Sequence, residues 1–177
     1  MGSINYGKAE IVMLILNEVP RDKVILDVGA CDGKWHSILG PYYTMDAVEI
    51  FTPSIEQYEL EKKYRYVFNC DIKDYEYGKK NDVVSEKYGC IVFGDVIEHM
   101  TVEDAQRTLE YAKKHADLVV VGVPYLWPQG RCYGNDWEEH IQDDLTHELF
   151  MERYPGFNLF MKKDNYGWYT TSSGSLQ

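Results

Sequence analysis

The chain has 177 residues, 45% of them hydrophobic and 27% charged, which is typical of one globular domain and excludes a disordered or low-complexity chain. The net charge of −11 argues against nucleic acid as a partner, because an acidic surface repels phosphates. No apolar run is long enough to cross a bilayer, and the four cysteines show neither zinc-site nor disulfide spacing. We therefore expect a cytoplasmic protein that binds no membrane.

Apolar runs of strand length alternate with helical patterns along most of the chain, which indicates parallel βαβ units in an α/β fold. The predicted elements, in order, are a helix at 6–17, strand 24–28, helix 35–39, strand 45–50, a helix opened by Pro53, strands 64–69 and 90–94, a helix at 102–115 capped by Thr101, and strand 118–123.

The C-terminal part is predicted to close one edge of the sheet. Residues 145–154 form the expected helix, and 157–161 and 166–169 alternate around a KKDN turn as in an antiparallel hairpin. No repeat or linker interrupts the chain, so we expect one domain over 4–170. The small, polar ends 1–3 and 171–177 are expected to lie outside it and to carry no function.

A glycine turn follows the first strand in the string LDVGACDGKW. Asp27, Gly29 and Gly33 lie where the strand turns into its helix, and crowding of the backbone there favours residues without side chains. Backbone amides at such a turn can hold the pyrophosphate or carboxylate of a nucleotide-type ligand, although a turn without a ligand has the same pattern. The third position of an NAD fingerprint is Cys31 here instead of glycine, which argues against an NAD-dependent oxidoreductase.

The next two strands also end in residues suited to a ligand. Glu49, at the end of the second strand, could accept hydrogen bonds from both hydroxyls of a ribose, or could be a solvated strand end. Asp71, after the third strand, could accept from an adenine amino group while Ile72 packs on the ring. Because open α/β sheets bind ligands at their carboxyl edge, three such strand ends indicate a common crevice.

The strings LDVGACDG, DAVEI, NCDI and FGDVIEHM, in this order, resemble the successive motifs of the class I S-adenosylmethionine-dependent methyltransferases over residues 24–124. The resemblance implies a Rossmann-like, doubly wound, mostly parallel sheet of seven strands with the last antiparallel. It also implies S-adenosylmethionine as cofactor and S-adenosylhomocysteine as product. Cys31 departs from the family, which usually has glycine there. The cofactor-binding residues that it implies are Asp27, Gly29, Ala30, Gly33, Glu49, Ile50, Asp71, Ile72 and Asp95.

Methyl transfer from a sulfonium is an in-line displacement, which depends on alignment and needs a base only if the acceptor carries a proton. The catalytic candidates are His99, His140 and Asp95. His99 is the first candidate base, because Asp95 lies four residues before it and would share its face if the turn after the strand is helical. His140 is the second candidate. Either histidine could instead be structural, His99 by orienting the loop over the cofactor and His140 as a surface residue. No metal site is predicted, because the acids and histidines of 138–147 lack a metal-binding spacing.

The segment after the fifth strand concentrates part of the high aromatic content, which is 14% of the chain. Residues 135–152 hold seven Asp and Glu and no Lys or Arg. Because aromatic faces beside carboxylates favour cations or flat rings, we expect a small amine-bearing or aromatic acceptor. Three alternatives remain. The acceptor could be a protein side chain, the chain could be a catalytically silent interaction module that binds the cofactor, or the aromatic residues could only cover the cofactor. The candidate acceptor-binding residues are Tyr125, Trp127, Tyr133, Trp137 and Glu139.

Overall fold

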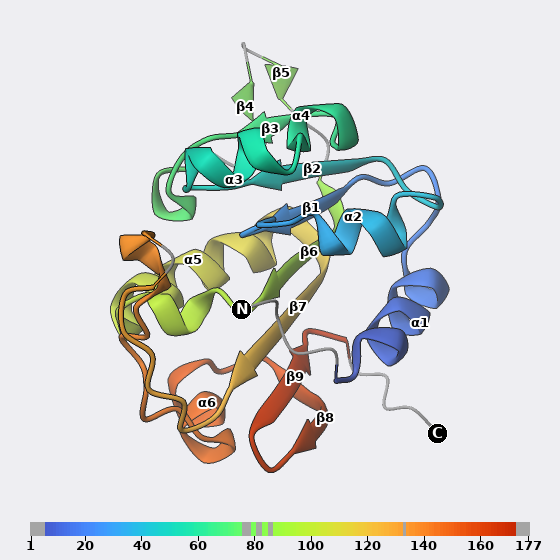
Figure 1. Cartoon of the computed structure of the whole chain (residues 1–177). Helices are drawn as coiled ribbons and strands as arrows, with labels where there is room; N and C mark the ends of the chain where they lie inside the picture. The colour runs from blue at the N-terminus through green and yellow to red at the C-terminus, as the bar shows by residue number, and fades with distance from the viewer. Residues whose placement is uncertain (1–5, 76–78, 81–82, 85–86, 133, 173–177) are drawn as a thin grey trace.

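The computed structural model describes residues 6–75, 79–80, 83–84, 87–132 and 134–172. The terminal segments 1–3 and 173–177 and the candidate Tyr133 lie outside the described residues, and the domain limits 4–170 stay a prediction. The main sheet has seven strands in the order β3-β2-β1-β6-β7-β9-β8 (Figure 1). Its strands are β1 (Ile25–Val28), β2 (Met45–Val48), β3 (Val67–Phe68), β6 (Tyr88–Gly94), β7 (Ala116–Pro124), β8 (Asn158–Lys163) and β9 (Tyr166–Thr170).

The five strands from β3 to β7 are parallel, and β9 and β8 are antiparallel at one edge. The predicted Rossmann-like sheet with its antiparallel C-terminal hairpin is therefore confirmed. Strand order reverses between β1 and β6, because the chain winds outward from β1 to β3 and then returns to β6 on the other side of β1. The carboxyl ends of β1 and β6 border a crevice at such a switch point.

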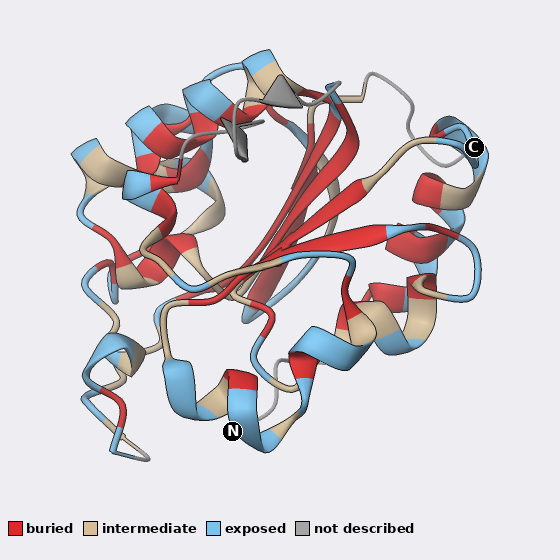
Figure 2. Ribbon diagram, turned by 90° about the horizontal axis from the view of Figure 1, so that it is seen from above, coloured by how far each residue is buried: buried red, intermediate tan, exposed pale blue. Residues whose placement is uncertain are grey.

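Helices cover both faces of this sheet. Figure 1 shows α5 and α6 on the opposite side of the sheet from α1 and α2. Along β6, Ile91 and Phe93 pack into the core of one face and Cys90 and Val92 into the core of the other, since successive strand residues point to opposite faces. Figure 2 shows the buried strands in the middle and the exposed residues on the outer sides of the helices. The helices are α1 (Lys8–Glu18), α2 (Lys34–Leu39), α3 (Thr52–Gln57), α4 (Leu60–Lys63), α5 (Val102–His115) and α6 (His147–Arg153).

Agreement with the predicted elements is best where the pattern is long. The bounds of α5 match the prediction, and the Asp104 amide donates to the hydroxyl of its N-cap Thr101 at 3.1 Å. The third strand is shorter than predicted, because Tyr64 ends α4 instead of starting a strand. The sequence did not predict α4 or the small antiparallel pair β4 (Lys79–Lys80) and β5 (Val83–Val84), since two to four residues are too few to show a period. No helix within the described residues is long and apolar enough to span a membrane.

Candidate functional site

A cavity of about 240 Å³ lies at the carboxyl edge of the sheet, beside the switch point between β1 and β6. Its walls come from the turns after β1 and β2, from the segment after β6 and from the loop after β7. It therefore occupies the place where open α/β sheets bind ligands. The predicted site residues that line it are Gly29, Ala30, Glu49, Ile50, Asp95, His99, Trp127, Trp137 and His140.

Backbone geometry explains the glycines of the turn after β1. Gly29 has φ of 69° and Gly33 of 76°, in the left-handed region that favours glycine, and a Cβ on Gly29 would lie 2.8 Å from a methyl carbon of Val96. Cys31 adopts the same region with φ of 46°, which costs a residue with a side chain about 1–2 kcal/mol. Cys31 is exposed as a whole, but desolvation of its sulfur in the cavity wall, and then the neighbouring Asp32 and Glu49, raise the pKa of the thiol to about 11, so it lines the cavity as a neutral thiol.

Glu49 connects the second strand to this turn. The Cys31 amide donates to Glu49 Oε2 and the Phe51 amide to Oε1, both at 2.8 Å. Burial raises the pKa of Glu49, and these amide bonds oppose the rise. Because each carboxylate oxygen has two acceptor sites, both oxygens keep capacity for a further donor. This arrangement suits the predicted role as a ribose ligand, which stays a prediction.

Asp27 lies fully buried beneath the turn and is not among the described residues that line the cavity. The Tyr64 hydroxyl donates to its Oδ2 at 2.5 Å, while Oδ1 has no hydrogen-bond partner among the described residues. Burial raises the pKa of Asp27 to about 7. Asp27 lies under the turn, and Gly33 is the N-cap residue of α2 at its end. Contact of either residue with a cofactor stays a prediction.

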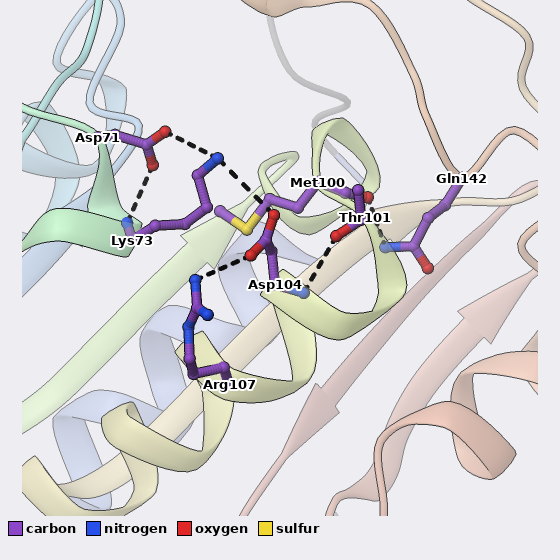
Figure 3. A network of polar contacts seen from close by, with 7 residues as sticks. All are labelled: Asp71, Lys73, Met100, Thr101, Asp104, Arg107 and Gln142. Carbon is purple, nitrogen blue, oxygen red and sulfur yellow. Dashed lines mark hydrogen bonds and ion pairs between the residues drawn. The ribbon is translucent and has the colours of Figure 1, made fainter.

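Asp71 and Ile72 also lie away from the described cavity lining. Asp71 caps a 3₁₀ turn, η1 (Ile72–Asp74): the Lys73 amide donates to its Oδ1 at 2.9 Å and the Lys73 ammonium lies 3.2 Å from Oδ2. Figure 3 shows this network continuing from Lys73 to Asp104 and Arg107 on α5. Ile72 is buried in the core. Adenine binding by Asp71 and Ile72 stays a prediction.

The segment after β6 brings two buried acids to the cavity. Asp95, with φ of 59°, has its Oδ2 buried without a hydrogen-bond partner among the described residues. Glu98, in the 3₁₀ turn η2 (Ile97–His99), is 1% exposed, and neither of its oxygens has such a partner. Burial raises the pKa of both carboxyl groups, and their proximity raises that of Glu98 further. Sequence reasoning missed Glu98, although it precedes His99 in the string FGDVIEHM.

His99 and His140 lie against each other edge to face, with ring centroids 4.7 Å apart. His99 Nδ1 is 3.1 Å from the carbonyl oxygen of Glu139, and His140 Nδ1 is 2.6 Å from that of Trp127. Since a carbonyl only accepts, each neutral ring carries its proton on Nδ1 and has a lone pair on Nε2. Burial, and then the neighbouring His140, lower the pKa of His99 to about 4. The two candidate bases, 41 positions apart in sequence, therefore share one site.

Of the four acceptor candidates among the described residues, Trp127 and Trp137 line the cavity, and Trp137 is 53% exposed. Tyr125 is buried, with its hydroxyl 2.5 Å from that of Tyr169, and Glu139 pairs with Arg131 at 3.2 Å. No short-range pattern marks the lining residues that were not predicted to belong to the site, which include Lys34, Trp35, Ser54, Gln129 and Asn135.

No family model matches the chain, and no curated protein matches it. Among solved structures it is similar to an S-adenosylmethionine-dependent methyltransferase from Clostridium acetobutylicum ATCC 824, with a TM-score of 0.67 and 12% identity over 94% of this chain and 91% of that one. The chain has the fold of the S-adenosylmethionine-dependent methyltransferases. The resemblance inferred from the four sequence strings is thereby confirmed for the fold.

Two further methyltransferases share this fold. The N-methyltransferase NodS from Bradyrhizobium japonicum WM9 has a TM-score of 0.61 and 11% identity, over 94% of this chain and 96% of that one. The magnesium protoporphyrin IX methyltransferase ChlM from Synechocystis PCC 6803, with bound S-adenosylmethionine, has a TM-score of 0.56 and 12% identity, over 97% of this chain and 86% of that one.

Within this methyltransferase fold, the cavity joins two chemically different walls. The turns after β1 and β2 supply backbone amides and the Glu49 carboxylate. The segment after β6 and the loop after β7 supply two imidazoles, two indoles and the carboxyl groups of Asp95, Glu98 and Glu138. The first wall can bind hydroxyl-rich and zwitterionic groups. The second can accept protons and bind cations or flat rings.

Proposed function

We propose that the chain transfers a methyl group from S-adenosylmethionine to a small acceptor that is amine-bearing or aromatic. One observation carries the proposal: in a methyltransferase fold, the switch-point cavity joins the wall of Gly29 and Glu49 to the wall of His99, His140 and Trp137. The bound S-adenosylmethionine of the similarly folded ChlM supports the choice of cofactor. The acidic and aromatic character of the second wall supports the choice of acceptor.

The cofactor supplies a methyl group on a positively charged sulfur. The residues of this chain then have two tasks, alignment and proton removal, of which alignment contributes most to an in-line displacement. Gly29, Ala30, Glu49 and Ile50 hold the donor at one wall of the cavity. His99, neutral at pH 7 and with a free lone pair on Nε2, removes the proton of a protonated acceptor, and His140 is the second candidate base.

Two alternatives share the same cavity. The exposed face of Trp137 and the acids beside it would also fit a basic side chain of another protein. A silent interaction module would bind the cofactor without turnover. Both keep the cofactor site; the first has a different acceptor and the second transfers no methyl group.

Calorimetric titration with S-adenosylhomocysteine tests the cofactor site. We expect the wild-type chain to bind, and Glu49→Gln to weaken binding by about tenfold or more, because bonds to a charged acceptor contribute about 1.5–3 kcal/mol each. Glu110→Gln, on the exposed face of α5, is the matched control and should bind as the wild type does. A wild-type chain that does not bind S-adenosylhomocysteine would refute the proposal.

Turnover tests the acceptor. The release of S-adenosylhomocysteine is measured with sets of small amines, phenols, basic peptides and carboxylic acids. We expect the amines or phenols to react. Reaction of carboxylic acids alone would contradict the acceptor class, reaction of basic peptides alone would favour a protein substrate, and binding without any turnover would favour the silent module.

A further inference from the structure

Three possible metal ligands meet in the second wall of the cavity. Glu98 and His99 come from η2, His140 comes from the loop after β7, and one ligand atom of each lies within 4.8 Å of those of the other two. We propose that Glu98, His99 and His140 bind one divalent transition-metal ion, of the class of Zn²⁺, Co²⁺ or Fe²⁺. The sequence shows no such site, because its two histidines are 41 positions apart.

Both histidines make the hydrogen bond through one ring nitrogen that is typical of metal ligands. Metal-binding histidines usually donate their second ring N–H to a carbonyl or carboxylate, which fixes the tautomer and the ring. The carbonyl oxygens of Glu139 and Trp127 accept from Nδ1 of His99 and of His140 in this way, at 3.1 Å and 2.6 Å. Nε2 is thereby the atom of each ring that is left to bind an ion.

Glu98 supplies the third ligand and the strongest reason for a cation. Its carboxyl group is almost completely buried, and neither oxygen has a hydrogen-bond partner among the described residues. Burying such a group is costly unless it is protonated or compensated by positive charge. A metal ion compensates it directly.

Backbone hydrogen bonds hold the two ligand segments together. The amides of Ile141 and Gln142 donate to the Glu98 carbonyl at 2.9 and 3.0 Å. The buried side-chain amide of Gln142 donates to the carbonyls of Ile97 at 2.8 Å and of Met100 at 3.2 Å, the latter visible in Figure 3. These bonds place His140 beside η2 without help from a ligand, so the site is preorganised.

The donor set selects the class of metal. Two imidazoles with one carboxylate suit Zn²⁺, Co²⁺ and Fe²⁺, whereas Mg²⁺ and Ca²⁺ prefer oxygen ligands alone. Three protein ligands leave coordination positions open, as in catalytic rather than structural sites. All three residues line the cavity, so those positions face the space that the acceptor would enter. A bound ion occupies the Nε2 lone pairs of both histidines, so His99 and His140 act as bases only in the metal-free chain.

Titration of the untagged full chain with Co²⁺, followed by calorimetry and by the visible absorption of the ion, tests the site. We expect one Co²⁺ per chain, and weaker binding of Mg²⁺. Glu98→Gln and His140→Ala should each raise the Kd for Co²⁺ by about tenfold or more, since even residues that only orient metal ligands contribute 10–100-fold. His115→Ala is the matched control, because His115 precedes β7 at the opposite edge of the sheet, and it should bind as the wild type does.

Absence of Co²⁺ binding by the wild type, or equal binding by Glu98→Gln and His140→Ala, would overturn the inference. Circular dichroism verifies that each variant is folded, and two variants from separate segments keep the test decisive if one does not fold. Binding of S-adenosylhomocysteine, measured on the same preparations, tests the proposed function separately. Binding of that product without Co²⁺ would overturn only the metal site, and binding of Co²⁺ without the product would support the metal site while the proposed function failed.

Discussion

Replacement of the buried acid Asp27 by asparagine should change how the stability of the chain depends on pH. Asp27 is fully buried, and its pKa rises to about 7 from an ordinary value of 3.8, chiefly because burial penalises the charged form. The folded chain therefore holds this proton more tightly than the unfolded chain. Asp27 contributes stability that is complete below about pH 4 and is lost as the pH rises through about 7.

The magnitude follows from these two pKa values. Each pKa unit corresponds to about 1.36 kcal/mol, and integration of the proton uptake between pH 5 and pH 8 gives a loss of about 2–3 kcal/mol from Asp27 alone. Asp27→Asn has no titrating group at this position. The free energy of unfolding of the wild type minus that of the variant should therefore fall by this amount between the two pH values. Any constant effect of the new amide cancels in the comparison.

Urea unfolding at pH 5 and pH 8, followed by circular dichroism, measures this difference. Asp22→Asn, at an exposed position, is the matched control and should leave the pH dependence of the wild type unchanged. If the wild type and Asp27→Asn changed in parallel between the two pH values, Asp27 would not hold a raised pKa, and the reasoning from its burial would be wrong.

Two further variants test the core and the acceptor wall. Gly122→Ala in β7 would place a Cβ 2.4 Å from the ring of the fully buried Trp168, so we expect the free energy of unfolding in urea to fall by about 1–3 kcal/mol. Gly130→Ala, with no atom within 4 Å of its Cβ, is the control and should lower it much less. Equal losses of stability in the two variants would contradict the packing argument. Trp137→Ala should raise the KM for the acceptor several-fold and leave S-adenosylhomocysteine binding unchanged, with the exposed Tyr111→Ala as control. An unchanged KM would remove Trp137 from the acceptor site.

Local patterns were sufficient to predict the long regular elements and the glycine turn after β1. The period of α5 and the apolar runs of β6 and β7 are visible in the sequence, because regular structure imposes its period on neighbouring residues. The glycine turn is visible because its conformation excludes most side chains. The parallel order of the strands then placed Gly29 and Glu49 at one edge, since parallel strands share a carboxyl end.

Contacts between distant segments decided the rest. Only the fold shows that Tyr64 reaches Asp27, so that Asp27 is a buried acid under the turn, and that Asp71 is occupied with Lys73. The same holds for His140, which lies beside Glu98 and His99 because the loop after β7 bonds to η2. Sequence periodicity and backbone sterics act over a few residues and so determined the strands and the glycine turn. Burial and the meeting of side chains depend on packing over the whole chain, and only the tertiary structure settled them.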